Sequence, residues 1–259
     1  MTASIDIPGS FPDPGAVRGK RVVITGAGRG LGSVLAHAFS DAGACVALVA
    51  RTEIDLKAVA NALPGPTLVI SGDVTDEDTN EAVADAAVAA WGGLDVWIAN
   101  AGISPIVAGP RETDASAWRR ILEVNLTGAF LGARAAARVM GPGGRLIFTG
   151  SVVGERPRAG LAAYSASKAG LAGMAKGLAL DLAPAGITVN VVAPGWFDSP
   201  MAAGWRDDPG LSADITGHTA QRRWGAPADL AGAYLFLASD ASAFVTGTVL
   251  SVDGGYLLV

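Results

Sequence analysis

The chain has 259 residues, half of them hydrophobic, and its 19 basic and 24 acidic side chains give a net charge of −5. This composition excludes a disordered chain, and a pI near 5.0 disfavours partners such as nucleic acid or an anionic membrane surface. One cysteine, no Cys/His cluster, no apolar leader and no uncharged apolar run of about 18 residues together predict a cytoplasmic protein without a disulfide, a metal site or a membrane span.

The first 18 residues are rich in proline and glycine and predict a flexible N-terminal arm ahead of a single domain over 19–259. From there on, short apolar runs alternate with longer segments of helical pattern. The runs are continuous, as in strands covered on both faces. They lie at 21–25, 45–50, 67–71, 94–99, 145–149, 187–193 and 248–252, and helices are expected at 30–42, 53–62, 76–91, 114–140, 162–183 and 227–238.

Alternation of strands and helices predicts right-handed βαβ crossovers. The expected fold is therefore a doubly wound α/β domain, with a seven-stranded parallel sheet flanked by helices. The segment 197–226 departs from this alternation, because it is long and shows no clear strand. We expect it to form a lid, since long loops in compact domains are usually functional or disordered.

A glycine-rich turn joins the first predicted strand to the first predicted helix. Glycines let the backbone approach a pyrophosphate, and a helix N-terminus adds free N–H groups and a positive dipole. Such a cluster also suits a simple tight turn, but its place between strand and helix indicates a dinucleotide site. The turn reads TGAGRGLG, and its candidate cofactor-binding residues are Gly26, Arg29, Gly30, Leu31 and Gly32.

The second strand ends without an acidic residue that would bond the ribose hydroxyls of NAD. Instead, Arg51 and Thr52 offer a cation and a hydroxyl to a 2′-phosphate, and Arg29 offers a second cation. This pattern favours NADP(H) as the cofactor. NAD(H) is the alternative, in which Arg51 is only a solvated residue at the start of the next helix.

The third and fourth strands also end in residues suited to a ligand, at the edge where open α/β sheets bind cofactors. Asp73 is either an acceptor for an adenine amine or a helix cap. The candidate cofactor contacts at these two ends are Asp73, Val74, Asn100, Ala101 and Gly102.

A tyrosine and a lysine, Tyr164 and Lys168, stand four residues apart at the start of the helix at 162–183, so they project from one face. Moving a tyrosine pKa from about 10 to neutrality takes roughly 4 kcal/mol, and a nearby ammonium and a cationic nicotinamide both favour the phenolate. Ser151 follows the fifth strand, where its hydroxyl can donate to a reacting carbonyl oxygen.

Together these motifs resemble the short-chain dehydrogenase/reductase family over residues 19–255, in its order and spacing. The resemblance implies a Rossmann-type fold and a catalytic set of Asn125, Ser151, Tyr164 and Lys168. In this set Asn125 holds a water of the proton relay, whereas Asn125 by itself would be an exposed or back-bonded residue within a helix. Tyr164 and Lys168 would also contact the cofactor, Lys168 through the nicotinamide ribose.

The segment 194–201 is similar to the family segment that holds the nicotinamide amide. It has a serine where threonine is usual, and ANAG at 99–102 has alanine in place of the family's first asparagine. The contacts that this likeness implies are Pro194, Gly195, Phe197 and Ser199.

The resemblance implies hydride transfer between nicotinamide C4 and a secondary alcohol or ketone, such as a sugar-like polyol or a cyclic ketone. A 3-oxoacyl-thioester reductase shares every motif, and a non-catalytic dinucleotide-sensing protein would keep the fold. Aromatic side chains near the lid favour an apolar ring unless they pack in the core, whereas nearby cations favour an anionic or polyhydroxy substrate. The aromatic residues are Trp196, Phe197 and Trp205, and the cationic ones are Arg156, Arg158, His218 and Arg222.

The helices at 114–140 and 162–183 carry small and apolar residues around more than one face. A helix that is apolar all round is normally buried on both sides. Together with the resemblance, this predicts a homotetramer or homodimer that packs through these helices. The residues concerned are Ala129, Phe130, Ala133, Ala136, Ala137, Leu171, Met174, Leu178 and Ala179.

Overall fold

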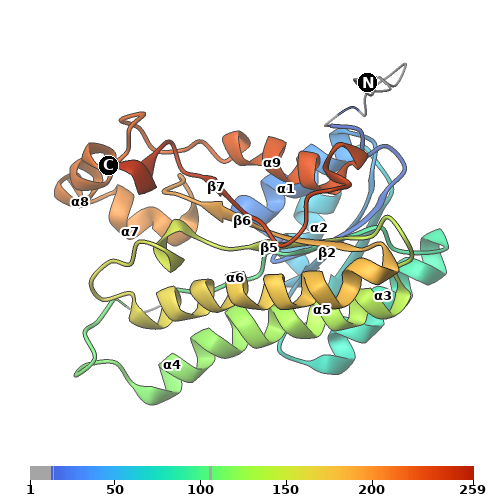
Figure 1. Ribbon diagram of the computed structural model, residues 1–259, viewed down its shortest axis with the longest axis horizontal. Coiled ribbons are helices and arrows are strands. Elements are labelled where there is room, and N and C mark those ends of the chain that lie inside the picture. The colour runs from blue at the N-terminus through green and yellow to red at the C-terminus, as the bar shows by residue number, and fades with distance from the viewer. Residues whose placement is uncertain (1–12, 14, 105–106) are drawn as a thin grey trace, which may run out of the picture.

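Seven strands form one sheet in the order β3-β2-β1-β4-β5-β6-β7, and every neighbouring pair is parallel (Figure 1). This computed structural model describes residues 13, 15–104 and 107–259. The strands are β1 (Arg21–Thr25), β2 (Cys45–Ala50), β3 (Thr67–Ser71), β4 (Val96–Ala99), β5 (Arg145–Thr149), β6 (Thr188–Pro194) and β7 (Val249–Val252). They confirm the predicted α/β fold, and the strand order reverses between β1 and β4, where such sheets open a crevice for ligands.

Two layers of helices cover the sheet, one on each face (Figure 1). The helices α3, α5 and α6 pack on one face, and α1, α2 and α9 pack on the other. Their bounds are α1 (Gly30–Asp41), α2 (Glu53–Ala60), α3 (Glu77–Trp91), α4 (Ala115–Leu122), α5 (Gly128–Val139), α6 (Ala162–Leu182) and α9 (Ala228–Ala238). Short 3-10 segments are η2 (Val152–Gly154), η3 (Ala183–Ala185), η4 (Pro200–Ala202), η5 (Asp240–Ser242) and η6 (Tyr256–Leu258).

Strand β4 shows why the apolar runs are continuous. Trp97 and Ala99 belong to the core under α3, α5 and α6, whereas Val96 and Ile98 belong to the core under α1 and α9. Because successive side chains of a strand point to opposite faces, a strand between two helix layers needs apolar residues at every position.

The predicted single helix at 114–140 is wrong in its middle. A π-helical turn, η1 (Glu123–Thr127), separates α4 from α5. Such turns insert an extra residue into the helix and often mark functional sites. The turn contains Asn125, whose contacts are described below.

The segment 197–226, expected to be a loop, contains α7 (Ala203–Arg206) and α8 (Pro209–Gly217). Helix α8 begins with a cap, because the Asp208 carboxylate accepts hydrogen bonds from the backbone of Gly210 and Leu211 at 2.8 and 2.9 Å. Asp followed by Pro is a recognised helix start, so the sequence carried this signal.

The predicted N-terminal arm lies mostly outside the described residues. Val17 is fully buried in the core next to α1, so the packed domain starts before residue 19.

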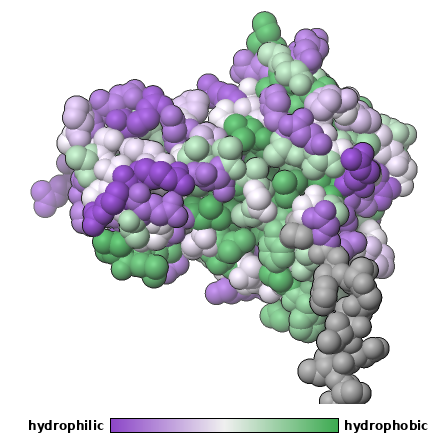
Figure 2. Space-filling model, turned by 90° about the horizontal axis from the view of Figure 1, so that it is seen from above, coloured by the Kyte–Doolittle hydropathy of each residue, from purple (hydrophilic) through white to green (hydrophobic). Residues whose placement is uncertain are grey.

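On the α1 and α9 side, hydrophobic residues gather in the middle of the surface and hydrophilic residues gather at the α7 and α8 end (Figure 2). Among the described residues, no helix combines the length and the apolar character needed to cross a bilayer.

Most of the apolar residues singled out on α5 and α6 face the sheet. Ala133 and Ala136 of α5, and Leu171 and Ala179 of α6, are buried in the core. The apolar surface that α5 and α6 expose to solvent is therefore smaller than the sequence indicated. It comes from side chains such as Phe130 and Leu180, which are 41% and 79% exposed.

Candidate active site

The glycine-rich turn packs directly against the end of β4. A Cβ on Gly32 would lie 2.2 Å from the Gly26 carbonyl oxygen, and a Cβ on Gly26 would lie 2.9 Å from Ala101 Cα. Gly26 also has a φ of 68°, which favours glycine. Asn100 ties the two strand ends together, because its side chain donates to the Thr25 carbonyl at 2.9 Å. The turn thus forms a close-packed cradle with backbone N–H groups at the α1 N-terminus, which fits a dinucleotide pyrophosphate.

The candidate phosphate-binding residues lie at the ends of β1 and β2, which are neighbours in the sheet. Arg29 is the exposed residue that precedes α1, and Gly30 and Leu31 open that helix. Arg51 is exposed at the end of β2, and Thr52 precedes α2. Both side chains are therefore open to solvent and available to a ligand bound at these strand ends.

Asp73, after β3, is not a helix cap in this structure. Its carboxylate accepts hydrogen bonds from the Thr75 backbone and hydroxyl at 3.0 and 2.9 Å, and it forms an ion pair with Arg120 at 2.9 Å. Burial alone would raise the pKa of Asp73, but these hydrogen bonds and the Arg120 charge outweigh it, and the net pKa is lowered. Asp73 is therefore ionised at neutral pH. The next residue, Val74, is buried, and its carbonyl accepts from Asn80.

Ser151, Tyr164 and Lys168 meet at the carboxyl end of β5. Ser151 follows the strand and accepts a hydrogen bond from the Val153 backbone at 3.2 Å. Lys168 is buried, donates to the Thr149 carbonyl at 2.7 Å and has its Nζ 5.5 Å from the centre of the Tyr164 ring. The spacing of four residues does place both side chains on one face of α6.

Burial dominates the protonation of this pair. It raises the pKa of Tyr164 to about 12, although the neighbouring Ser151 hydroxyl acts in the opposite direction. It lowers the pKa of Lys168 to about 8. Desolvation disfavours both charged forms, so burial opposes the shift toward phenolate that a nearby ammonium and a cationic nicotinamide would favour. At neutral pH the tyrosine remains a proton donor.

Asn125 is buried in the π-helical turn, neither exposed nor back-bonded. Its Oδ1 accepts from the Ile103 backbone at 2.8 Å, and its Nδ2 donates to the Ile103 carbonyl at 2.9 Å and to Ser167 Oγ at 3.1 Å. A Cβ on Gly102 would lie 3.4 Å from Asn125 Oδ1 and 3.5 Å from Lys168 Nζ. Gly102 therefore leaves room between the asparagine and the lysine.

Some of the residues at and after the end of β6 lie at the carboxyl edge of the sheet, and one of them packs into the core. Pro194 ends β6, and Gly195 packs so closely on Asp253 that a Cβ would lie 2.7 Å from the Asp253 Cα. Ser199 precedes η4. The Phe197 side chain, however, is buried in the core on the α1 and α9 side. Of the two alternatives given for this aromatic residue, core packing is the one observed, because the Phe197 ring fills the space over Gly225 and does not favour a ring substrate.

An apolar cluster surrounds Tyr164. Its buried members are Val152, Val153, Leu161 and Tyr256, and Tyr164, Trp196, Trp205 and Leu257 pack against them. The rings of Trp196 and Trp205 are 5.3 Å apart. Beside Tyr164, a cavity of about 430 Å³ separates the start of α6 from the segment that leads into α4. The space around the tyrosine is thus mainly apolar and aromatic.

The four cations near the lid do not point to an anionic ligand. Arg158 forms an ion pair with Asp214 of α8 and lies over the rings of Trp196 and Trp205. His218 also contacts Asp214. Arg156 donates to the backbone of the C-terminal residues Tyr256 and Val259, and Arg222 donates to the Gly217 carbonyl. Arg156 and Arg158 are bonded within the chain because the C-terminus and α8 fold back onto the loop after Ser151, whereas His218 and Arg222 find their partners within the lid segment itself.

Comparison with known proteins agrees with this geometry. A family model described as enoyl-(acyl carrier protein) reductase matches residues 26–257. The chain is 40% identical over 245 residues to cis-4-hydroxycyclohexanecarboxylate dehydrogenase of Sinomonas cyclohexanicum, covering 92% of this chain and 96% of that protein. The chain belongs to the short-chain dehydrogenase/reductase family.

Other members of the short-chain dehydrogenase/reductase family are similar over nearly the whole chain. The chain is 38% identical to 3beta-hydroxysteroid dehydrogenase 1 of Eggerthella lenta, with 93% and 95% of the two chains covered. It is also 38% identical to the 3-oxoacyl-(acyl-carrier-protein) reductase FabG of Escherichia coli, with 93% and 98% covered. A short chain dehydrogenase from Burkholderia cenocepacia in complex with NADP has a TM-score of 0.85 at 33% identity, with 93% and 99% covered.

This short-chain dehydrogenase/reductase is therefore an NAD(P)-dependent oxidoreductase that acts on alcohol or carbonyl groups.

Sequence reasoning missed several residues at its candidate site. Arg120 reaches Asp73 from a position 47 residues away, and Asp214 holds Arg158 from 56 residues away. No local pattern marks such partners. In the described part of the chain, no group of His, Cys, Asp and Glu side chains is arranged to hold a metal ion.

Proposed function

We propose that the protein is an NADP(H)-dependent dehydrogenase/reductase of a cyclic secondary alcohol or ketone. The observation that carries this proposal is the place of Tyr164, which stands beside Ser151 and Lys168 within an aromatic and aliphatic cluster. An apolar wall of this kind suits a hydrocarbon ring better than a polyol, because a polyol would leave hydroxyl groups without hydrogen-bond partners. Two relatives are named for hydroxylated ring substrates, a hydroxycyclohexanecarboxylate and a hydroxysteroid.

In the direction of reduction, Ser151 and Tyr164 hydrogen-bond the substrate carbonyl oxygen, and the Tyr164 hydroxyl gives its proton to that oxygen. The raised pKa of Tyr164, about 12, keeps this proton in place until the oxygen becomes basic. Lys168 would hold the nicotinamide ribose of a bound cofactor, and it supplies a positive charge beside the phenol ring. Asn125 fixes the backbone of Ile103, whose neighbour Gly102 lies beside Lys168. When bound, the cofactor supplies hydride from nicotinamide C4 and, in its oxidised form, a positive charge that favours the phenolate during alcohol oxidation.

The residues that would hold the cofactor fit a phosphorylated dinucleotide. The close-packed turn at Gly26 and Gly32 accommodates the pyrophosphate, and Gly195 and Ser199 lie at the edge where the nicotinamide would bind. Arg29 and Arg51 are both exposed, and they follow the ends of the neighbouring strands β1 and β2, where a 2′-phosphate would need cations. A relative binds NADP. These observations support NADP(H) over NAD(H).

The test is oxidation of NADPH or NADH, followed by absorbance, with substrate panels of cyclic ketones, ketosugars and acetoacetyl thioesters, and of the corresponding alcohols in reverse. We expect turnover with NADPH and cyclic ketones. Preference for acetoacetyl thioesters would favour the 3-oxoacyl-thioester reductase, an alternative supported by the likeness to FabG. Cofactor binding without turnover of any panel member would favour a dinucleotide-sensing protein and contradict the proposal.

Arg51 provides a sharper test of cofactor choice. Replacing Arg51 by Gln removes a charge-assisted hydrogen bond to the 2′-phosphate, which is worth about 1.5–3 kcal/mol. We expect KM for NADPH to rise about tenfold or more, with KM for NADH unchanged. An equal change in both constants would show that Arg51 does not contact the phosphate. Glu53→Gln, two residues further on in α2, is the matched control.

The same proposal includes self-association and a lid. Phe130 and Leu180 are exposed on α5 and α6, the helices expected at the interface between subunits, and favour a homodimer or homotetramer. Light scattering tests this, and a monomer at all concentrations would contradict it.

The lid is the second part of the proposal. The helices α7 and α8 would close over the substrate, and the ion pair between Arg158 and Asp214 connects α8 to the loop after Ser151.

A further inference from the structure

The Asp73 carboxylate has one hydrogen-bond acceptor position left. Its Oδ1 accepts two hydrogen bonds from Thr75, and its Oδ2 accepts one from Arg120 Nη2 at 2.9 Å. The two oxygens of a carboxylate together offer about four lone-pair positions. One position therefore remains, on Oδ2. The Asp73 side chain is 33% exposed, so this position is within reach of a ligand at the carboxyl edge of the sheet.

Arg120 fixes the direction in which that position points. It comes from the last turn of α4, and its guanidinium contacts Asp73 through Nη2 while its Nη1 lies 3.5 Å from Thr75 Oγ1. An arginine that reaches both partners holds a planar carboxylate in one orientation more firmly than a single-point contact would. Without Arg120, only Thr75 would hold the carboxylate, and Oδ2 would have no contact.

We propose that Arg120 is a positioning residue for cofactor recognition: it turns Asp73 so that Oδ2 accepts one N–H from the 6-amino group of the cofactor's adenine. The pair thereby sets a preference for a 6-amino purine over a 6-oxo purine. A 6-oxo purine presents an oxygen to the carboxylate, which repels it. This inference rests on the use of an adenine dinucleotide, and not on the substrate or on the choice between NADP and NAD.

The experiment measures dissociation constants by calorimetry for NADP⁺ and its 6-oxo (hypoxanthine) analogue, and for the same pair derived from NAD⁺. A hydrogen bond to a charged group is worth about 1.5–3 kcal/mol, so we expect the wild type to prefer the adenine form about tenfold or more. In Arg120→Gln we expect most of this preference to be lost, because the adenine form weakens and the 6-oxo form does not. Arg120→Lys should recover part of it.

Kinetics and a control variant separate positioning from a general effect on the fold. In Arg120→Gln, KM for the reduced cofactor should rise and kcat should stay within about twofold, since the acting group is remote from the hydride. Arg138→Gln is the matched control, because Arg138 also pairs with an aspartate, Asp85, but on the exposed face of α5. Its preference for the adenine form should equal that of the wild type.

A double variant keeps the test decisive if Arg120→Gln is less stable. Asp73→Asn should also lose the preference, and Asp73→Asn combined with Arg120→Gln should show no further loss, because Arg120 acts through Asp73. Additive losses would overturn the inference. So would a preference that survives in Arg120→Gln, or an equal weakening of the adenine and 6-oxo forms. A wild type that binds neither pair would overturn this inference and the proposed function together, whereas binding without turnover would leave this inference supported.

Discussion

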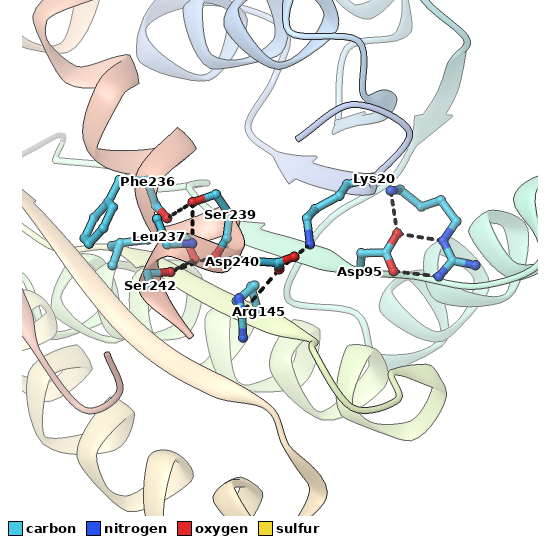
Figure 3. Close-up of polar contacts among 10 residues, drawn as sticks. Lys20, Asp95, Arg145, Phe236, Leu237, Ser239, Asp240 and Ser242 are labelled. Carbon is cyan, nitrogen blue, oxygen red and sulfur yellow. Dashed lines mark hydrogen bonds and ion pairs between the residues drawn. The ribbon is translucent and has the colours of Figure 1, made fainter. Parts of the chain in front are cut away.

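Both edges of the parallel sheet bury cations, but they give them different partners. At the amino edge, Asp240 lies between Lys20 and Arg145, with Nζ and Nη2 at 3.2 and 3.5 Å from its carboxylate (Figure 3). Nearby, Arg21 and Asp95 form a two-pronged pair with contacts of 2.6 and 2.7 Å. At the carboxyl edge, the buried Lys168 donates to a backbone carbonyl, and burial lowers its pKa to about 8.

This difference separates charges that stabilise the fold from charges that respond to a ligand. At the amino edge the Asp95 carboxylate raises the pKa of Arg21, and although burial lowers the pKa of Arg145, a guanidinium remains protonated in proteins. A buried ammonium held by a carbonyl keeps a perturbed pKa, so a nearby charge can shift its equilibrium. We therefore expect variants at the carboxyl edge to change catalysis and pH dependence, and variants at the amino edge to change stability alone.

The largest expected effect tests the carboxyl edge. Tyr164→Phe removes the proton donor, so kcat should fall about 100-fold or more while cofactor binding is retained. The control is Tyr234→Phe, which removes the hydroxyl of another buried tyrosine, on α9, bonded to Thr149 Oγ1 at 2.7 Å. That variant should lose about 1 kcal/mol of stability and keep most of its activity. Near-normal turnover in Tyr164→Phe would contradict its assignment as the acid.

The next effect concerns the pH dependence of stability. The pKa of Lys168 is lowered from 10.5 to about 8, so between these values the unfolded chain binds a proton that the folded chain lacks. The stability that this residue contributes is present above the unfolded pKa and is lost as the pH falls through about 8. Relative to Lys168→Met, the free energy of unfolding of the wild type should rise by about 2–3 kcal/mol from about pH 7 to about pH 10.

Urea denaturation at the two pH values measures this change. Arg145→Met is the matched control at the amino edge, because a guanidinium keeps its proton throughout this range. Its difference from the wild type should not vary with pH. A constant difference for Lys168→Met as well would show that the lysine is not the titrating group.

The smallest expected effect lies at the amino edge. Asp95→Asn removes the charge that holds Arg21, and since both side chains are partly exposed we expect a loss of about 1–2 kcal/mol in unfolding free energy. Turnover and KM should stay within about twofold, because the edge is remote from Tyr164. A clear fall in kcat would show that the two edges are coupled and would weaken the comparison.

The sequence by itself determined the sheet and the glycine-rich turn, and it placed Tyr164 and Lys168 on one helix face. These features depend on local rules: a strand between two helix layers is apolar at every position, and residues four apart share a helix face. The predicted and observed bounds of β1, β2, β3 and β5 therefore coincide. The helix cap at Asp208 was also local, and its signal was present in the sequence. The candidate catalytic set as a whole, Asn125 included, came from the resemblance to a family.

Only the tertiary structure decided how the side chains of the candidate site are held. Phe197 lies in the core, Asn125 bonds Ile103 from a π-helical turn, and Arg120 orients Asp73. In each case the deciding contact comes from a residue distant in the sequence, so no spacing or periodicity records it. The protonation of Tyr164 and Lys168 was decided in the same way, because burial depends on every element packed around them and outweighs the effect of the one neighbour that the sequence shows.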